Sequence, residues 1–566
     1  EEKPEVPHPE TLVTTNYGDA SELDPVFCYD GGVIQILNVY DSLIFFDREH
    51  VDKFVPVLAT EVPTLENGLI SSDGLTYTFT IREGVKFSNG NPMTPEDVEY
   101  SFERRLVEDP DGGPNWMLFQ PFLDDYGSRD WETGEIVYTA EDFDSIVEVD
   151  GNNVVFHLAK PYPSFLQVLS LTTGSIFDKE WCVEQGCWPG TWDNWQEYNN
   201  PEISLLASKM MGTGPYKLEK VEAGVECLVL LNENYWGEEP QIKKIHWQFI
   251  DEWSTRKMKF LQGDIDVLGP EDAAHIPELE GEEGVTIYKD LATATVTCTV
   301  FNFNISPDSE YIGSGALDGE GIPTDFFTDK NVRLGFAYSF PYEDHIEQAW
   351  VGQGKRIATP IPDNVPYFNP DQEMFEHDLA KAEDYFKQAW GGEVWTKGFK
   401  LTLPYPIETE EYRIAAEMLA DELKKVNPNF QLTPFGIEYT AYWAVAEGDY
   451  PCPFPLVTGS WWPDTLDCDN FLAGAYMGSW GYYTWNMDSS NEQIEDLLAK
   501  GSGTLDPDVQ REAYYALQKL YYDDAMGIPL LQWYDNYVMR DWIQGFYFRP
   551  IWYDSNLYYH FTKGYD

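Results

Sequence analysis

The residues with the clearest capacity for chemistry lie close together in the segment 459–485, GSWWPDTLDCDNFLAGAYMGSWGYYTW. The carboxylates of Asp464, Asp467 and Asp469 are set among tryptophans and tyrosines there. Aromatic faces give a ligand adaptable apolar contact, while a small number of polar groups fix its orientation. The segment is therefore a candidate wall of a ligand cleft. Packing in an ordinary core is the alternative, because aromatic side chains dominate cores as well.

Motifs of catalysis are absent from the sequence. It has no GxSxG nucleophile elbow, no HExxH zinc motif and no GxxxxGK[ST] phosphate loop. The histidines are isolated from one another, which disfavours a metal site. The three aspartates leave calcium as a minor alternative, although no EF-hand glycine and distal glutamate follow them. We therefore expect a binding protein with no enzymatic activity, no cofactor and no metal.

The balance of charge is strongly acidic. The 566 residues include 98 acidic and 36 basic side chains, which gives a formal net charge of −62. This balance argues against the binding of nucleic acid or anionic lipid through a basic patch, whereas a cationic partner or a saline habitat would suit it. Its length exceeds the size at which a single core stops growing, so two or three domains are expected.

Export from the cytoplasm is indicated by the first residues. The chain begins EEKPEVPHPE, a sequence typical of a flexible spacer, and no apolar run approaches the roughly 18 residues that a membrane helix needs. We expect a signal segment, with or without a lipid-bearing cysteine, to have been removed upstream. Cys182 and Cys187 could close a small disulfide loop outside the cytoplasm, and the odd total of seven cysteines leaves one unpaired within the chain.

Local patterns predict several elements in the first part of the chain. Residues 77–81 alternate apolar and polar side chains, as a half-buried strand does. Thr94 then caps a helix, with Pro95 at its first position and Asp97 three residues after the cap. Residues 34–43 also have helical spacing, and the face that they would bury holds Ile34, Leu37 and Val39.

The segment 76–101, TYTFTIREGVKFSNGNPMTPEDVEYS, resembles the signature of the family 5 extracellular solute-binding proteins. This family includes the dipeptide- and oligopeptide-binding components of ABC importers, and also binders of nickel complexes and oligosaccharides. Further segments resemble the family in the expected order, and they are 211–218, 231–237, 260–267, 300–304, 329–338, 378–383 and 470–472.

The resemblance implies an α/β protein with the two-lobed periplasmic-binding-protein-like fold, type II, in its large variant with an extra inserted subdomain and a hinge between the lobes. The division that it implies is a spacer at 1–10, a first lobe from 11–56, 209–293 and 518–566, an inserted subdomain at 57–208, and a second lobe at 294–517. It also implies a monomeric extracytoplasmic protein that captures short peptides and delivers them to the membrane subunits of an ABC importer.

Peptide-binding members of the family hold the ligand's terminal ammonium with an aspartate in a Trp-x-x-Asp stretch shortly before Asn-Phe-Leu. In this sequence Trp461-Trp462-Pro463-Asp464 stands at that place. The resemblance implies that Asp464 anchors the amine and that Trp461 and Trp462 line the pocket. An ion pair gains strength as closing lobes remove water from it. Asp467 and Asp469 are then expected to structure the loop or to be solvated.

Further candidates for the cleft come from the same resemblance. Tyr17 and Asn302 occupy places that face the cleft in relatives; a packed turn aromatic and a strand-edge hydrogen bonder are the respective alternatives. Dipeptide-specific members also hold the ligand's carboxylate with a basic residue. Arg356 and Arg413 are candidates for this role, and a surface position is the alternative for each.

Two residues of the loop depart from the family's pattern. Trp462 stands where many members have a small or acidic residue, and Cys468 stands where a proline is common. An enlarged aromatic wall would admit flat ligands, so an oligosaccharide stacked on the tryptophans is the alternative ligand. A surface or assembly protein that retains the binding fold is the alternative function.

Overall fold

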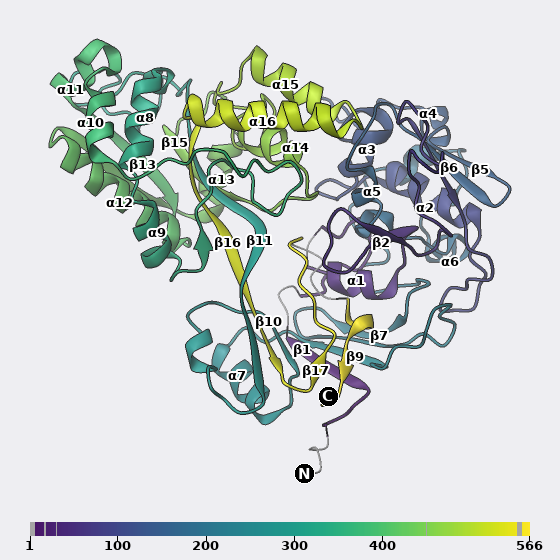
Figure 1. Ribbon diagram of the computed structural model, residues 1–566. Coiled ribbons are helices and arrows are strands. Elements are labelled where there is room, and N and C mark those ends of the chain that lie inside the picture. The colour runs from purple at the N-terminus through teal and green to yellow at the C-terminus, as the bar shows by residue number, and fades with distance from the viewer. Residues whose placement is uncertain (1–5, 16–18, 30, 449, 552–556, 566) are drawn as a thin grey trace. The chain divides into compact units, whose positions relative to one another are not determined.

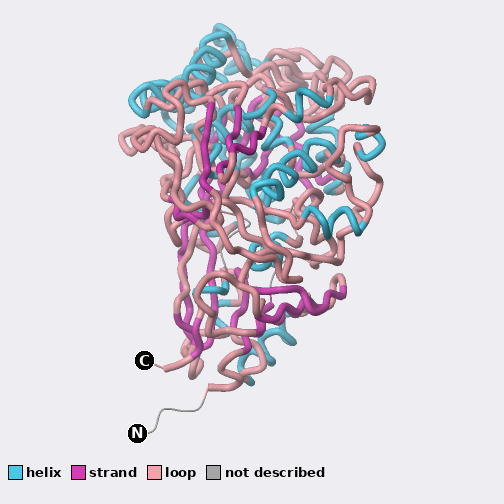
Figure 2. Tube along the Cα trace, turned by 90° about the vertical axis from the view of Figure 1, so that its right-hand side faces the viewer, coloured by secondary structure: helices cyan, strands magenta, loops and turns pink. Residues whose placement is uncertain are grey.

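The computed structural model describes residues 6–15, 19–29, 31–448, 450–551 and 557–565. The chain divides into two compact units, of which unit 1 takes residues 1–289 and 536–566 and unit 2 takes residues 290–535. The division falls inside two long strands, β11 (Val285–Phe301) and β16 (Gly527–Arg540). Loops make up much of the length between the elements (Figure 2). The finer division expected from the sequence, with its inserted subdomain at 57–208, stays a prediction.

The main sheet of unit 1 is mixed. β1 (Thr11–Thr15) lies between β9 (Lys244–Gln248) and β10 (Val267–Pro270) and runs parallel to both. β8 (Glu226–Leu231) and β7 (Tyr216–Glu222) extend the sheet from β9 in antiparallel pairing. Between β9 and β10 the chain forms α7 (Trp253–Gln262), whose Phe260 packs in one apolar core with Leu268 and Val538.

A smaller antiparallel sheet in unit 1 has the order β4 (Thr76–Thr80), β6 (Asn153–His157), β5 (Val147–Asp150). Tyr77 and Phe79 are buried while the threonines between them are half-buried, which confirms the predicted strand. The helix α2 (Pro95–Glu108) lies against this sheet (Figure 1). Its predicted capping box is confirmed, because the Asp97 carboxylate accepts the Thr94 backbone N–H at 2.8 Å.

The helix predicted at 34–43 is α1 (Val33–Val39), and its predicted buried face is wrong in part. Val33, Ile36 and Val39 are buried, whereas Ile34 and Leu37 are half-buried. The helix begins one residue earlier than expected and ends at Val39, so the chain is extended again at Tyr40. A stripe at three-residue spacing from Val33 therefore faces the interior.

The remaining elements of unit 1 are short, and they are β2 (Ile44–Phe46), β3 (Phe54–Pro56), α3 (Trp116–Leu123), α4 (Ala140–Asp144), α5 (Phe165–Val168), η1 (Thr172–Gly174), α6 (Lys179–Gln185), η2 (Trp195–Tyr198), η3 (Ile276–Glu278), β17 (Ile543–Gln544), η7 (Tyr558–His560) and β18 (Thr562–Lys563).

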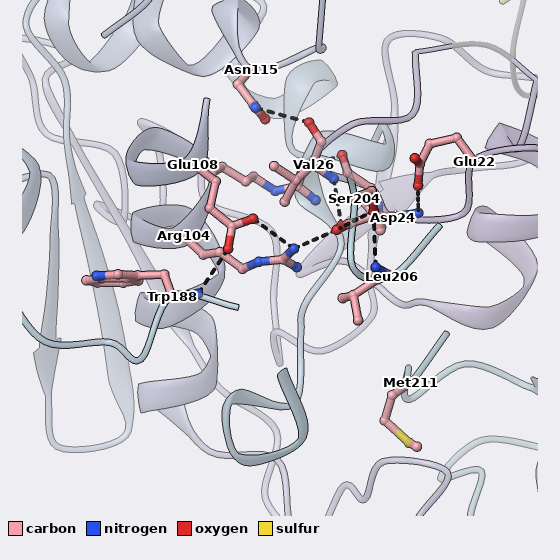
Figure 3. A network of polar contacts seen from close by, with 12 residues as sticks. Glu22, Asp24, Val26, Arg104, Glu108, Asn115, Trp188, Ser204, Leu206 and Met211 are labelled. Carbon is pink, nitrogen blue, oxygen red and sulfur yellow. Dashed lines mark hydrogen bonds and ion pairs between the residues drawn. The ribbon is translucent and has the colours of Figure 1, made fainter. Parts of the chain in front are cut away.

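Figure 3 shows a buried network of charges that ties α2 to neighbouring loops of unit 1. One terminal nitrogen of Arg104, Nη2, lies 2.6 Å from Asp24 Oδ2 and 2.9 Å from Glu108 Oε2. Glu108 also accepts the backbone N–H of Trp188 at 3.0 Å, and Asp24 accepts the hydroxyl of Ser204 at 3.2 Å. Breaking a buried ion pair leaves an uncompensated charge, so this network holds the loops in one position against α2.

The possible disulfide between Cys182 and Cys187 is not formed, because both residues are buried free thiols. Cys182 lies in α6, and Cys187 follows Gly186, the left-handed residue that ends this helix. The two thiols are joined by a hydrogen bond, and burial raises the pKa of Cys182 well above its usual value. The protonated thiol is thus the favoured form in this interior.

Unit 2 contains the parallel pair β13 (Phe399–Pro406) and β14 (Phe430–Ile437), connected by α12 (Glu410–Val426). The helices α8 (Lys330–Ser339), α10 (Leu379–Phe386) and α12 lie near β13 (Figure 1), and their buried side chains belong to a core rich in aromatic rings. In this core the Phe399 and Phe430 rings stack with centroids 4.6 Å apart. Stacked and edge-on aromatic pairs add to the burial energy of such a core.

The other elements of unit 2 are η4 (Phe326–Thr328), α9 (Tyr342–Ala349), β12 (Gly354–Lys355), η5 (Ala389–Gly392), α11 (Glu393–Lys397), α13 (Tyr439–Gly448), β15 (Leu456–Trp461), α14 (Cys468–Phe471), the π-helical turn η6 (Leu472–Tyr476), α15 (Glu492–Ser502) and α16 (Pro507–Asp523).

A buried carboxylate on α2 makes the stability of unit 1 depend on pH. Glu103 is 6% exposed and has neither a hydrogen bond nor an ion pair within the described part of the chain. Burial, followed by the nearby carboxylates of Glu99 and Asp144, raises the pKa of Glu103 to about 8. The folded protein therefore keeps a proton on Glu103 that the unfolded chain releases near pH 4.5.

We expect Glu103→Gln to raise the free energy of unfolding by roughly 1–3 kcal/mol at pH 8.5 and to change it little at pH 5. The wild type loses stability as the pH rises from the unfolded pKa through the folded one, whereas glutamine carries no charge at either pH. Chemical denaturation at the two pH values measures the difference. The exposed Glu132→Gln is the control, and an equal gain at both pH values for Glu103→Gln would contradict this assignment.

Candidate ligand-binding site

The first part of the candidate site is the strand that delivers Trp461. β15 pairs antiparallel with β11, in a register that sets Trp461 opposite Val296 and Ser460 opposite Thr297. The hydroxyls of Thr297 and Ser460 lie 2.7 Å apart, and those of Thr299 and Thr458 lie 2.9 Å apart in the next pair on this face. Buried hydroxyls need such partners, so the two pairs fix the register of β15 up to its last residue.

The acidic loop after β15 is held by Asp467. This residue caps α14, since its Oδ1 accepts the backbone N–H of Asn470 at 2.8 Å. Its other carboxylate oxygen accepts the hydroxyl of Thr465 at 2.7 Å. The expectation that Asp467 structures the loop is therefore confirmed.

Asn470 connects the two principal candidates of the loop. Its Oδ1 accepts the indole N–H of Trp461 at 2.8 Å. Its Nδ2 lies 3.5 Å from Oδ2 of Asp464, which is 6% exposed. The Trp461 indole and the Asp464 carboxylate thus share one amide, which is itself fixed by the cap at Asp467. Asn470 was noted in the sequence only as the end of the acidic loop, and its bridging role needed the structure.

The aromatic residues of segment 459–485 divide between core and surface. Tyr476 and Tyr483 are buried, and the Tyr483 hydroxyl donates to the carbonyl of Ser460 at 2.5 Å. Tyr482 and Trp480 are exposed by 40% and 80%, and Trp461 is half-buried. Tyr476 and Tyr483 are therefore ordinary core residues, while the rings of Trp461, Trp480 and Tyr482 reach the surface.

Trp461 and Trp462 belong to different aromatic clusters. The Trp461 ring lies 5.5 Å from Tyr482 and 6.2 Å from Tyr483. The Trp462 ring instead meets Trp533 of β16 edge-on at 5.3 Å. Since successive residues at the end of a strand point to opposite faces, the two indoles do not form one continuous wall.

A second cluster forms around Trp533, which the sequence analysis did not single out. The Trp533 indole N–H donates to the hydroxyl of Thr297 at 2.8 Å, and its ring lies 4.6 Å from that of Trp350. Asp535, two residues further on, lies on the same face of β16 and is half-buried. Burial raises the pKa of Asp535 to about 7. A carboxylate in the interior of a strand otherwise rich in apolar residues was the available signal for this position.

Asn302 is buried and uses its amide within unit 2. Its Nδ2 donates to the carbonyls of Cys452 and Phe454, each at 2.8 Å, and its Oδ1 accepts the Asn304 backbone N–H at 2.9 Å. These contacts favour the alternative role at the strand edge. Ligand binding by Asn302 stays a prediction.

Arg356 is engaged in contacts within unit 2. Its guanidinium pairs with Glu343 at 2.5 Å, donates to the carbonyl of Phe375 and lies 4.3 Å from the centroid of the Tyr342 ring. These partners favour a structural role over capture of a ligand's carboxylate, and its role in ligand binding stays a prediction. Arg413 pairs with Glu410 and Glu417 on the surface of α12.

Tyr17, the remaining candidate, lies outside the described residues. Across the part of the chain that is described, no group of three or more histidine, cysteine, aspartate or glutamate side chains could hold a metal ion. No described helix combines the length and the apolar character needed to cross a bilayer.

We expect Asp467→Ala to lower the free energy of unfolding by about 1 kcal/mol, because it removes the cap of α14 and the partner of Thr465. Asp467→Asn keeps an oxygen that can accept the Asn470 N–H and should recover most of the loss. Urea denaturation measures both variants. Equal losses for alanine and asparagine would show that the capping bond contributes nothing.

The chain is similar to characterised proteins along most of its length. It is 24% identical over 493 residues to the probable D,D-dipeptide-binding periplasmic protein DdpA of Escherichia coli, covering 85% of this chain and 81% of that protein. It is 23% identical over 527 residues to heme-binding protein A of Haemophilus influenzae, covering 91% of this chain and 86% of that protein.

A solved structure has the same fold. The periplasmic binding protein DppA of Helicobacter pylori, in complex with the peptide STSA, superposes with a TM-score of 0.69 at 22% identity and covers 98% of both chains. The expected two-lobed, type II α/β fold is thereby confirmed. Residues 53–483 match the family model described as bacterial extracellular solute-binding proteins, family 5 middle. The chain therefore belongs to the family 5 extracellular solute-binding proteins of bacteria.

Proposed function

We propose that this protein captures short peptides outside the cytoplasm and delivers them, chemically unchanged, to the membrane subunits of an ABC importer. Asp464 anchors the terminal ammonium of the peptide, and Trp461 and Trp462 line the space beside it. The observation that carries this proposal is the buried Asp464 carboxylate, held through Asn470 beside the half-buried Trp461 indole.

The environment of Asp464 suits an ammonium ion. A carboxylate that is screened from water interacts with a cation more strongly than an exposed one does. Asn470 and the cap at Asp467 hold the loop in place, so little ordering is needed when the ligand arrives. The dipeptide-binding relative and the peptide-bound structure support the choice of ligand class.

The amine anchor is tested with tri-alanine and its N-acetylated form. We expect Asp464→Asn to weaken the binding of tri-alanine by about 2–5 kcal/mol, because a buried ammonium loses its partner. N-acetyl-tri-alanine should bind weakly to both the wild type and the variant, so the two changes are not additive. Isothermal titration calorimetry measures all four affinities.

Asp488→Asn serves as the matched control, because Asp488 is an exposed carboxylate of the same unit. It should bind tri-alanine as the wild type does. If Asp464→Asn binds tri-alanine as tightly as the wild type does, Asp464 is not part of the site. If, in addition, N-acetylation of the peptide still weakens binding, the amine is recognised by another residue.

The oligosaccharide alternative predicts the opposite effects for substitutions of the same residues. It requires that Trp461→Ala and Trp462→Ala abolish binding of a linear glucose trisaccharide while Asp464→Asn has little effect. The separation of Trp461 and Trp462 into different clusters counts against a shared stacking wall. A surface or assembly role would appear as oligomers in light scattering with divalent cations, whereas we propose a monomer.

The ligand class itself is tested by purifying the protein from its source without refolding, denaturing it and identifying the released molecules by mass spectrometry. Short peptides of mixed sequence are expected. Oligosaccharides or a heme would contradict the peptide assignment and leave the family membership intact.

A further inference from the structure

A single carboxylate on the inner strand β16 has no counter-ion. Asp535 is half-buried and makes no hydrogen bond or ion pair with any residue that the structure describes. Burial is the cause of its raised pKa. The site therefore carries the cost of partly removing a carboxylate from water without a compensating partner.

The face of β16 that carries Asp535 also carries Trp533, around which two further indole rings gather. Trp533 lies on the same face of β16, two residues away. Its ring contacts Trp462 edge-on at 5.3 Å and Trp350 at 4.6 Å, and its indole N–H is held by Thr297. The three tryptophans are half-buried, so their rings remain partly accessible.

This combination selects for positive charge. An ammonium or guanidinium group gains a charge-assisted hydrogen bond from a carboxylate and a cation–π contact from an indole face, most of all where water is displaced. A neutral side chain would gain only apolar contact, and an anionic one would be repelled. The formal net charge of −62 adds a long-range attraction for cationic ligands.

The cluster is also connected to the proposed amine anchor. Trp462 begins the loop that carries Asp464, and the same residue packs on Trp533. Asp464 and the cluster around Trp533 therefore belong to the same unit, and each combines a carboxylate with aromatic rings.

We propose that Asp535, with Trp350, Trp462 and Trp533, forms a subsite for a cationic side chain of the ligand, so that peptides containing lysine or arginine are preferred. This inference rests on the proposed peptide function and deepens it. Asp535 supplies the ion pair, and the tryptophans supply the apolar and cation–π contacts to the side chain.

The test uses three pairs of tripeptides of alanine, with lysine or norleucine at the first, second or third position. Norleucine keeps the aliphatic chain of lysine and lacks its amine. For at least one position, the wild type should bind the lysine peptide at least tenfold more tightly than its norleucine partner. Asp535→Asn should reduce that preference to less than threefold and leave the affinity for the norleucine peptide within twofold of the wild type.

Asp371→Asn, an exposed carboxylate of unit 2, is the control and should keep the full lysine preference. Thermal unfolding shows whether Asp535→Asn is folded, and we expect it to be at least as stable as the wild type, since it removes an uncompensated carboxylate. Trp462→Leu provides a second variant and should lower the lysine preference severalfold.

The outcomes separate this inference from the proposed function. Equal binding of lysine and norleucine peptides by the wild type, or a preference that survives Asp535→Asn, would overturn the cationic subsite and leave peptide capture intact. If no tripeptide binds to the wild type, the peptide function fails, and the subsite is overturned with it.

Discussion

The pairing of β15 with β11 is the constraint on which both candidate clusters depend. β11 is buried from residue 293 to residue 301, and it lies between β15 and β16 in the sheet. Its backbone groups must therefore be satisfied by those two strands. The hydroxyls of Ser460 and Thr458, which pair with those of Thr297 and Thr299, also fix the register. A slip of one residue would place apolar side chains of β11 opposite these two hydroxyls. The faces on which Trp461 and Trp462 lie are thus decided by residues that have no part in ligand contact.

The register of β15 against β11 also explains why Trp461 and Trp462, which are adjacent in sequence, pack in different clusters. Trp461 packs with the exposed Tyr482 and with Tyr483, whose hydroxyl is bonded in the core, while Trp462 packs against the tryptophan of β16. The loop that follows carries Asp464 and is closed by the cap at Asp467. An extended ligand with more than one recognised group suits this arrangement better than a flat ring, which would need both indoles on one side.

The sequence was most informative where the interactions are local. The capping box at Thr94, the strand with Tyr77 and the loop-structuring role of Asp467 each depend on residues within a few positions of one another, and each was predicted. The face of α1 was missed in part, because the predicted range left out Val33, and Ile34 and Leu37 lie one residue, or about 100°, round the helix from the buried Val33 and Ile36. The amide of Asn302 is held by carbonyls about 150 residues away. The Trp533 cluster likewise depends on the order of strands in the sheet, which hydrophobic periodicity does not reveal.

Buried carboxylates in this acidic chain differ in what surrounds them. Asp24 and Glu108 share the guanidinium of Arg104, which offsets part of their negative charge inside the fold and holds α2 in place. At Glu103 burial and the carboxylates of Glu99 and Asp144 outweigh the opposing charge of Lys179, so a proton is the partner that its surroundings favour. Among the residues that the structure describes, Asp535 has neither an ion pair nor a hydrogen bond, and Trp533 on the same strand face belongs to a cluster of half-buried indole rings. Glu103 thus makes stability depend on pH, whereas at Asp535 a cation from outside would gain both an ion pair and aromatic contact, which is the basis of the proposed subsite.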